Sequence, residues 1–163
     1  MKRIEGMWNT QYKDRLKLLG MYSTERRTQR YRIIYCWKIV QGLVPNCGLT
    51  VVGARPGRGR ILKVPKIMTK GRKAREESFS VEGPLLFNCL PSKIRNFNGK
   101  KEEFKKLLDG FLVGIPDEPV LNTDGNNCTR ANGCRSNSVR DWIKIVKTDN
   151  AEWWNMDAEF SGL

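Results

Sequence analysis

The chain has 163 residues, of which 39% are hydrophobic, and its 30 lysines and arginines against 17 aspartates and glutamates give a net charge of +13. This length suffices for one modest domain with a small core. No histidine is present, which excludes histidine general-base chemistry and Ser-His-Asp catalysis, and no apolar run reaches the length of a membrane span or a signal-peptide core. We therefore expect an intracellular protein, in the nucleus or the cytoplasm, that is not secreted.

The charge is concentrated in the first two thirds of the chain. Residues 1–116 hold 25 bases and 9 acids, a net of +16, whereas residues 117–163 hold 5 bases and 8 acids, a net of −3. A body this cationic attracts polyanions, and nucleic acid is the expected partner, although charge does not choose between RNA and DNA. An anionic membrane is the competing polyanion, but the sequence lacks a long basic amphipathic helix, so no membrane partner is expected.

Two helices are predicted near the N-terminus. The first covers residues 13–19 and ends at Gly20. The second begins near Thr24, because Ser23 offers a hydroxyl N-cap to the exposed amides of a helix start. It ends near Gly42, a residue that favours the C-terminal boundary of a helix.

The second helix is predicted to have a cationic and an apolar side. Its basic candidates for contact with nucleic-acid phosphates are Arg26, Arg27, Arg30 and Arg32, and a merely solvated helix face is the equally weighted alternative. The apolar side is assigned to Tyr31, Ile33, Ile34, Tyr35, Trp37, Ile39 and Val40. Its aromatic rings could stack on unpaired bases, but their spacing favours a buried core.

A glycine-rich basic segment, residues 53–77, is predicted to be flexible because it lacks the apolar residues of a core. Its candidates for phosphate contact are Arg55, Arg58, Arg60, Lys63, Lys70, Arg72, Lys73 and Arg75. Such a segment can fold along a nucleic-acid backbone on binding. Residues 70–75 also fit a nuclear-import address. A short edge strand is expected at residues 61–65, paired with residues 78–81.

The remaining pattern predicts further helices. One opens at Gly83 and Pro84 and ends before Pro91, and another covers residues 100–112 with an apolar stripe that includes Phe104 and Phe111. Residues 122–138 form a linker, followed by a weakly indicated helix at 140–146. The predicted fold is mainly α: a small helical domain with a short two-stranded β element, residues 1–119, and a flexible, disordered acidic C-terminal tail, residues 120–163.

Metal and cofactor chemistry is not expected. The five cysteines are an odd, scattered set, which argues against a disulfide framework and predicts free thiols. The alternative is a zinc site at Cys128 and Cys134, but the paired Cys-x-x-Cys spacing is missing. No phosphate-cradling Gly-x-x-x-x-Gly-Lys motif is present either, and no small-molecule substrate is predicted.

Three blocks of the chain resemble a known family. Residues 12–45, 78–96 and 104–112, in this order and spacing, look like the region that follows the reverse transcriptase domain in jockey-like (LINE-type) non-LTR retrotransposon proteins. The resemblance covers roughly residues 3–119, with a weaker echo at residues 137–142. It implies an origin as a truncated or decayed copy of such an element, since Met1 falls inside the family's continuous region.

The resemblance implies an RNA-directed DNA polymerase as the parent protein, but not an enzyme in this chain. Polymerases of this type hold two metal ions with clustered aspartates, whereas Asp14, Asp109 and Asp117 are isolated and are interpreted as solvated charges. We expect an accessory part that holds template RNA or target DNA. The alternative is a structural remnant without independent activity, whose apolar helix would pack on the missing polymerase domain.

Overall fold

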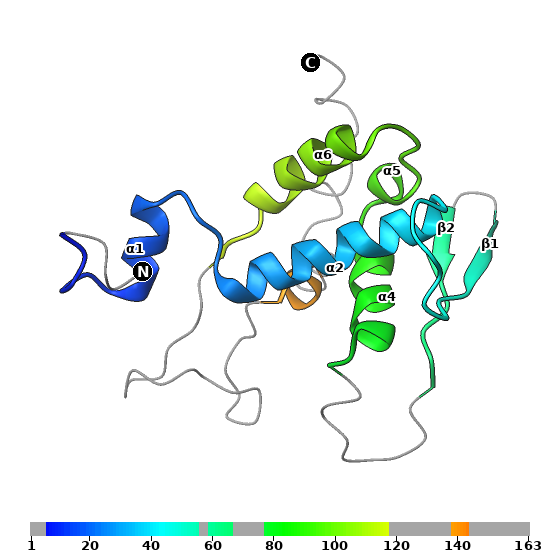
Figure 1. The fold of residues 1–163 in the computed structure, drawn as a ribbon, viewed down its shortest axis with the longest axis horizontal. Helices are drawn as coiled ribbons and strands as arrows, with labels where there is room; N and C mark the ends of the chain where they lie inside the picture. The colour runs from blue at the N-terminus through cyan, green and yellow to red at the C-terminus, as the bar shows by residue number, and fades with distance from the viewer. Residues whose placement is uncertain (1–5, 56–58, 67–76, 118–137, 144–163) are drawn as a thin grey trace.

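The computed structural model describes residues 6–55, 59–66, 77–117 and 138–143. In chain order its elements are α1 (Tyr12–Leu18), α2 (Thr24–Val40), β1 (Val51–Arg55), β2 (Gly59–Leu62), α4 (Phe79–Cys89), α5 (Ser92–Arg95) and α6 (Lys101–Val113). Residues 139–143 add a short helical segment. The predicted fold class, mainly helical with one short two-stranded antiparallel sheet, is confirmed (Figure 1).

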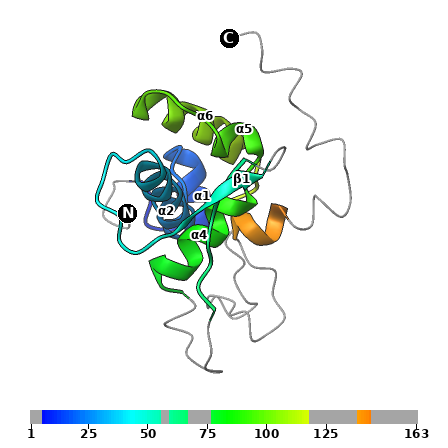
Figure 2. The same ribbon diagram turned by 90° about the vertical axis from the view of Figure 1, so that its right-hand side faces the viewer.

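Helix α2 is the central element, and its ends follow the sequence prediction. The Ser23 hydroxyl accepts a hydrogen bond from the Arg26 backbone N–H at 3.1 Å, which satisfies one of the exposed amides of the first turn. Gly42 has a φ of 70°, a left-handed conformation that glycine adopts without steric cost, and it lets the chain leave the helix. Figures 1 and 2 show α6 on one side of α2 and α4 on the other.

The core forms where α2 meets α4 and α6. Trp37 is fully buried and stacks on Phe104 of α6, with ring centroids 4.4 Å apart and planes at 7°. Its indole N–H donates to the Phe97 carbonyl at 3.1 Å, so the polar atom of this side chain is also satisfied. Phe87 of α4 is fully buried in the same cluster, as is Leu108. This core covers the apolar side chains of α2 with elements of the chain itself.

The sheet forms with a different partner from the one predicted. β2 pairs antiparallel with β1, in a register that places Val51 opposite Leu62 and Val52 opposite Ile61. The other side of β2 meets α4, where the Asn88 carboxamide accepts from the Leu62 N–H at 2.9 Å and donates to the Leu62 carbonyl at 2.7 Å. One side chain thus supplies the two hydrogen bonds that a neighbouring strand would give.

The predicted pairing of residues 78–81 with residues 61–65 is therefore wrong. Residues 79–81 are the first turn of α4, where the Ser78 carbonyl accepts from the Glu82 N–H at 2.9 Å. Pro84 consequently lies inside the helix and not in its first turn. Gly83 packs closely against α2, because a Cβ there would lie 3.0 Å from the Cys36 sulfur. The alternation of Phe79 and Val81 fits both a strand and a helix start.

The helix predicted at residues 100–112 is confirmed as α6, and its first turn is supported by the Glu103 carboxylate, which accepts from the Lys100 N–H at 3.3 Å. The last predicted helix is confirmed over residues 139–143. Val139 and Ile143 of this segment are buried in the core, and the Val139 N–H donates to the Gln29 side chain at 3.1 Å.

The prediction of a flexible tail over residues 120–163 is therefore wrong for residues 138–143, because their two apolar side chains complete the core. The rest of that tail, including the linker predicted at residues 122–138 up to residue 137, lies outside the described residues. Among the helices that the structure describes, none combines the length and the apolar character needed to cross a lipid bilayer.

Candidate nucleic-acid-binding surface

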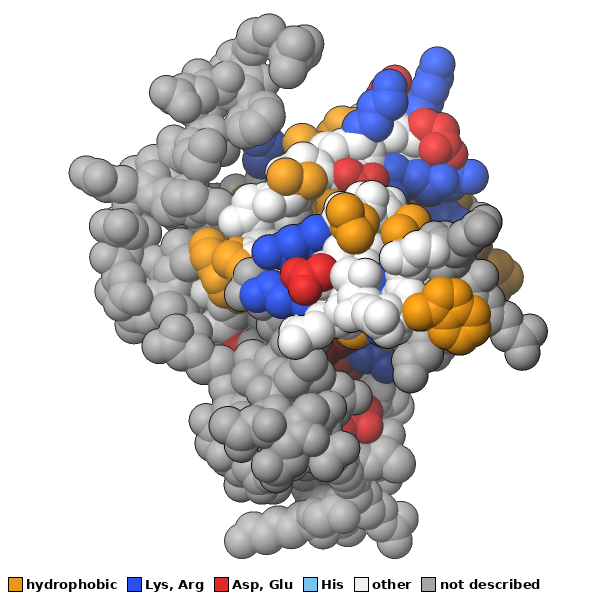
Figure 3. All heavy atoms as spheres, turned by 90° about the vertical axis from the view of Figure 1, so that its left-hand side faces the viewer, with side chains coloured by type: hydrophobic (Ala, Val, Ile, Leu, Met, Phe, Trp, Pro, Cys, Tyr) orange, Lys and Arg blue, Asp and Glu red, His pale blue; other side chains and the backbone are white. Residues whose placement is uncertain are grey.

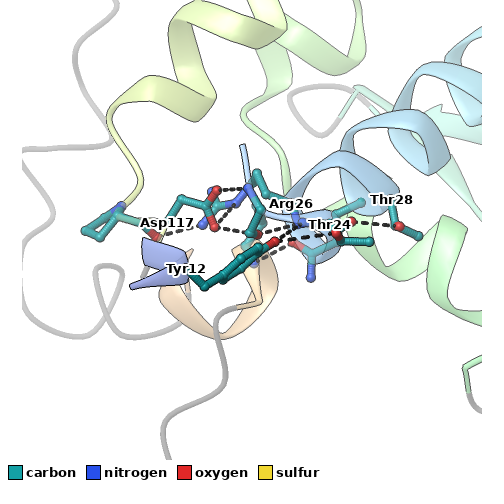
Figure 4. A network of polar contacts seen from close by, with 9 residues as sticks. Tyr12, Thr24, Arg26, Thr28 and Asp117 are labelled. Carbon is teal, nitrogen blue, oxygen red and sulfur yellow. Dashed lines mark hydrogen bonds and ion pairs between the residues drawn. The ribbon is translucent and has the colours of Figure 1, made fainter. Parts of the chain in front are cut away.

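Arg26 is an internal residue. Its side chain is 0% exposed, its Nη2 donates to the Pro116 carbonyl at 2.7 Å, and its Nε lies 3.9 Å from Asp117 Oδ1 (Figure 4). Burial lowers the pKa of this guanidinium, and the Asp117 carboxylate opposes that shift. The prediction of a solvated, phosphate-facing Arg26 is wrong, because this side chain lies on the same side of α2 as Gln29, Ile33 and Trp37.

Asp117 ties the end of the α6 segment to the start of α2. Its two carboxylate oxygens accept from the Ser23 N–H at 2.6 Å and from the Ser23 hydroxyl at 2.7 Å. A carboxylate at a helix N-terminus also interacts favourably with the helix dipole. Figure 4 shows Asp117 directed at the first turn of α2, beside Arg26. The interpretation of Asp117 as a solvated charge is therefore wrong.

Arg30 is also paired within the chain. Its Nε and Nη2 donate to the two oxygens of Asp109, at 2.5 and 2.7 Å, in the bidentate geometry that guanidinium and carboxylate favour. The hydrogen bond to Asp109 raises the pKa of Arg30. Asp109 is thus a structural partner and not a solvated charge, whereas Asp14 on α1 is exposed as predicted. Arg30 contributes less free charge to a ligand surface than its position in the sequence indicates.

Arg27 and Arg32 lie on the side of α2 that the core leaves open. Arg27 Nη2 donates to the Thr24 hydroxyl at 3.3 Å, and Arg32 Nη2 donates to the Glu77 carbonyl at 2.9 Å. Both hydrogen bonds are in exposed surroundings, and both go to neutral acceptors, so they leave the positive charge of each guanidinium available. Of the four arginines predicted on this helix, these two can reach a ligand.

The basic segment is described only in part. Arg55 ends β1, Arg60 lies half-buried in β2, and Lys63 is exposed just after it. The Arg60 N–H donates to the Asn96 side chain at 2.8 Å, which fixes this part of the segment to the turn after α5. The remaining candidates, Arg58, Lys70, Arg72, Lys73 and Arg75, lie outside the described residues.

The part of the basic segment that follows β2 is attached to the helical body at both of its ends. At one end the Asn88 carboxamide holds Leu62, whose side chain is buried. At the other end the Glu77 carbonyl accepts from Arg32, and α4 begins two residues later. Between these anchors, residues 63–75 carry six cations and no acid. Figure 1 shows the chain descending from β2 beside α4, toward the end of the molecule where α4 begins.

On the face of the molecule that carries α1, basic and acidic side chains lie close together. Figure 3 shows that Lys and Arg side chains gather there in groups that include acidic side chains. On α6, for example, Glu102 accepts from Lys105 at 3.1 Å and lies 3.3 Å from Lys101 Nζ, and these hydrogen bonds lower the pKa of Glu102. Cations that already have an acidic neighbour attract a polyanion less strongly than cations without one.

Two tyrosines predicted in the core are on the surface. Tyr31 is 64% exposed and Tyr35 is 37% exposed, whereas Trp37 is buried as predicted. Of the other residues assigned to the apolar side, Ile33, Ile34 and Ile39 are buried as well, and the buried residues of α2 also include Arg26, Gln29 and Cys36. The prediction was wrong for the two tyrosines and for Arg26, because it treated every tyrosine as apolar and every arginine as solvated.

Thiols and acids do not form a metal site in the part of the chain that the structure describes, where no three cysteine, aspartate or glutamate side chains come together. Cys36, Cys47 and Cys89 are free thiols, as predicted for the cysteines in general. Cys128 and Cys134, the alternative zinc ligands, lie outside the described residues. Burial raises the pKa of the Cys36 thiol to about 12.

Comparison with known proteins adds no family to these observations. A scan of protein-family models, a search of curated proteins and a search of solved structures found no match to this chain. The resemblance to the retrotransposon region therefore stays a prediction.

Proposed function

We propose that this chain is a nucleic-acid-binding accessory part of a reverse transcriptase-like retrotransposon protein, a fragment that lacks the catalytic aspartates and holds template RNA or target DNA by contacts to the phosphate backbone. The observation that carries the proposal is the attachment of the basic segment on both sides of residues 63–75. Leu62 is held by α4 through Asn88, and Glu77 is held by α2 through Arg32. Lineage enters only through the resemblance of the three sequence blocks.

Anchoring matters because a tethered cationic loop loses less conformational entropy on binding than a free tail of the same charge. The six cations of residues 63–75 can follow a phosphate backbone while the helical body stays folded. Arg27 and Arg32, on the open side of α2, extend the positive surface beyond the loop. Contacts of this kind bind without base specificity, which suits a part that keeps a long template beside a polymerase.

A structural remnant without activity of its own is the second candidate. One observation favours it: the exposed rings of Tyr31 and Tyr35 on α2 resemble the aromatic residues enriched in protein interfaces. Against it, Trp37 and the isoleucines of the same helix are buried in the core of the described residues, so the aliphatic part of this helix has no need of an outside partner. A remnant would bind nucleic acid only weakly and would aggregate when separated from its partner.

The test is a titration of the full chain against labelled single-stranded RNA and duplex DNA of equal length over a series of salt concentrations. One variant carries Gln in place of Lys70, Arg72, Lys73 and Arg75. The matched control carries Gln in place of Lys100, Lys101, Lys105 and Lys106, which removes the same charge from the α6 region. If the loop contacts phosphates, the loop variant lowers the salt-dependence slope by about 3, and the control lowers it much less.

Equal slopes for the two variants would reduce the proposal to a nonspecific effect of net charge. Weak, salt-insensitive binding by the folded wild-type chain would contradict it and favour the remnant. Circular dichroism of each variant checks that the helices remain.

A further inference from the structure

The open side of α2 forms a shallow hollow of about 410 Å³ against the start of α4. Three aromatic rings line it, Tyr31 and Tyr35 from α2 and Phe79 from α4, together with the cations Arg32 and Lys38. Tyr31 and Tyr35 are one helical turn apart, which places them about 6 Å from each other along the helix axis. Among the described residues that line this hollow, hereafter the tyrosine groove, none is acidic.

The rings of the tyrosine groove are held in place by their neighbours. Tyr35 meets Phe79 edge to face, with centroids 5.3 Å apart and planes at 74°. The Arg30 guanidinium lies 5.8 Å from the centroid of the Tyr31 ring, and the bidentate pair with Asp109 fixes that guanidinium. Rings that are already positioned lose little entropy when a ligand stacks on them.

The cations stand beside the rings. Arg32 is fixed by its hydrogen bond to the Glu77 carbonyl, and Lys38 follows Tyr35 by one turn. Arg27 lies on the same open side, in a smaller hollow that also includes Tyr31. Exposed aromatic faces bordered by cations are the chemistry that binds single-stranded nucleic acid, with bases on the rings and phosphates on the cations. Paired bases in a duplex do not present their faces for such stacking.

We propose that the tyrosine groove binds unpaired bases of single-stranded nucleic acid, with one base stacked on Tyr31, one on Tyr35, and the neighbouring phosphates held by Arg32 and Lys38. This inference rests on the proposed function, because it takes nucleic acid as the partner, and it adds the strandedness that the basic segment does not specify. Tyr31 and Tyr35 differ by about 6 Å in position along the helix axis, which exceeds the 3.4 Å per nucleotide of a stacked strand, so we expect the bound strand to be stretched at this point.

The experiment compares the full chain with three variants on a fluorescein-labelled single strand of mixed sequence and on the duplex of the same sequence. The test variant carries Tyr31→Leu and Tyr35→Leu, which keep apolar bulk and helix propensity but remove the ring faces. The rescue variant carries Tyr31→Phe and Tyr35→Phe, which keep the faces and lose the hydroxyls. Trp8→Leu, an exposed aromatic outside the groove, is the matched control.

The Leu variant is expected to lose on the order of tenfold affinity per ring for the single strand, with an unchanged salt-dependence slope and unchanged duplex affinity. The Phe variant and the Trp8 control are expected to bind like the wild type. Single-strand affinity that survives in the Leu variant, or is lost equally in the Phe variant, would overturn the stacking site. If the wild-type chain bound neither the single strand nor the duplex, the proposed function itself would be contradicted. Failure of the stacking site and failure of the proposed function therefore give different results.

A second measurement does not depend on the variants. Irradiation of the wild-type complex with a strand that contains a halogenated pyrimidine, followed by peptide mapping, is expected to place crosslinks on Tyr31 or Tyr35. Crosslinks confined to other peptides would contradict the proposal. Sedimentation of the free chain checks the protein alternative, since self-association that the Leu substitutions abolish would make the groove a contact between two copies.

Discussion

The two sides of α2 use the same residue types for opposite purposes. Arg26 on the covered side meets Asp117, and the half-buried Arg30 beside the open side meets Asp109, so both arginines hold distant parts of the chain together. On the open side, Arg32 and Lys38 border exposed aromatic rings. An arginine in a basic helix therefore stabilises the fold if a carboxylate lies beside it, and otherwise its charge is available to a ligand. Net charge consequently overstates the positive surface that a polyanion can contact.

The largest effect is expected from a comparison of the aromatic residues on the two sides. Trp37→Ala removes a fully buried ring that stacks on Phe104, and we expect a loss of about 3–5 kcal/mol in the free energy of unfolding. Tyr31→Ala, on the open side, is expected to cost less than about 1 kcal/mol. Urea unfolding followed by circular dichroism measures both. Equal losses would mean that the two sides of α2 are not distinct.

The carboxylates that pair with the arginines provide the next comparison. Asp117→Ala leaves the buried Arg26 without its counter-charge and removes two hydrogen bonds to Ser23, so we expect a loss of about 3 kcal/mol. Asp109→Ala breaks a pair that is partly exposed to solvent, and a loss of about 1 kcal/mol or less is expected. The same unfolding measurement applies, and a smaller loss for Asp117 than for Asp109 would contradict the assignment of Arg26 to the interior.

Alkaline pH tests the covered side through Cys36. The folded chain holds the pKa of this thiol at about 12, above its ordinary value of 9.0, so folding favours the protonated form. Between these values the unfolded chain releases the proton and the folded chain keeps it. The free energy of unfolding should therefore fall by about 1.4 kcal/mol per pH unit above pH 9. Cys36→Ala is expected to be less stable at neutral pH, but with a shallower fall, and parallel curves would contradict the buried thiol.

The smallest stability effects are expected on the open side, where binding is the informative readout. Arg32→Gln should change the free energy of unfolding by no more than about 0.5 kcal/mol and lower the salt-dependence slope for nucleic acid by about 1. Arg30→Gln, which leaves Asp109 unpaired, should cost about 1 kcal/mol in stability and leave the slope nearly unchanged. The opposite pattern would exchange the roles of the two arginines.

Local sequence patterns were sufficient to predict the features that depend on neighbouring residues. The Ser23 cap, the left-handed Gly42 and the stripe of α6 were predictable because each depends on residues close in sequence. The strand pairing was not, because residues 78–81 fit a strand or a helix equally well until Asn88 takes the free edge of β2. The candidate site was likewise predictable only in part. Its cations were identified from the sequence, whereas its exposed tyrosines were predicted to lie in the core.

The mainly helical fold, the basic charge and the lack of clustered aspartates were predictable from the amino-acid sequence, since helix ends, charge and residue type are read along the chain. Tertiary structure alone decided which arginines are buried, which acids neutralise them, and which rings of α2 face solvent. Those outcomes depend on partners about 80 to 90 positions away, as Arg30 with Asp109 and Arg26 with Pro116 show. No local pattern encodes such pairs, because burial and charge pairing are properties of the packed molecule.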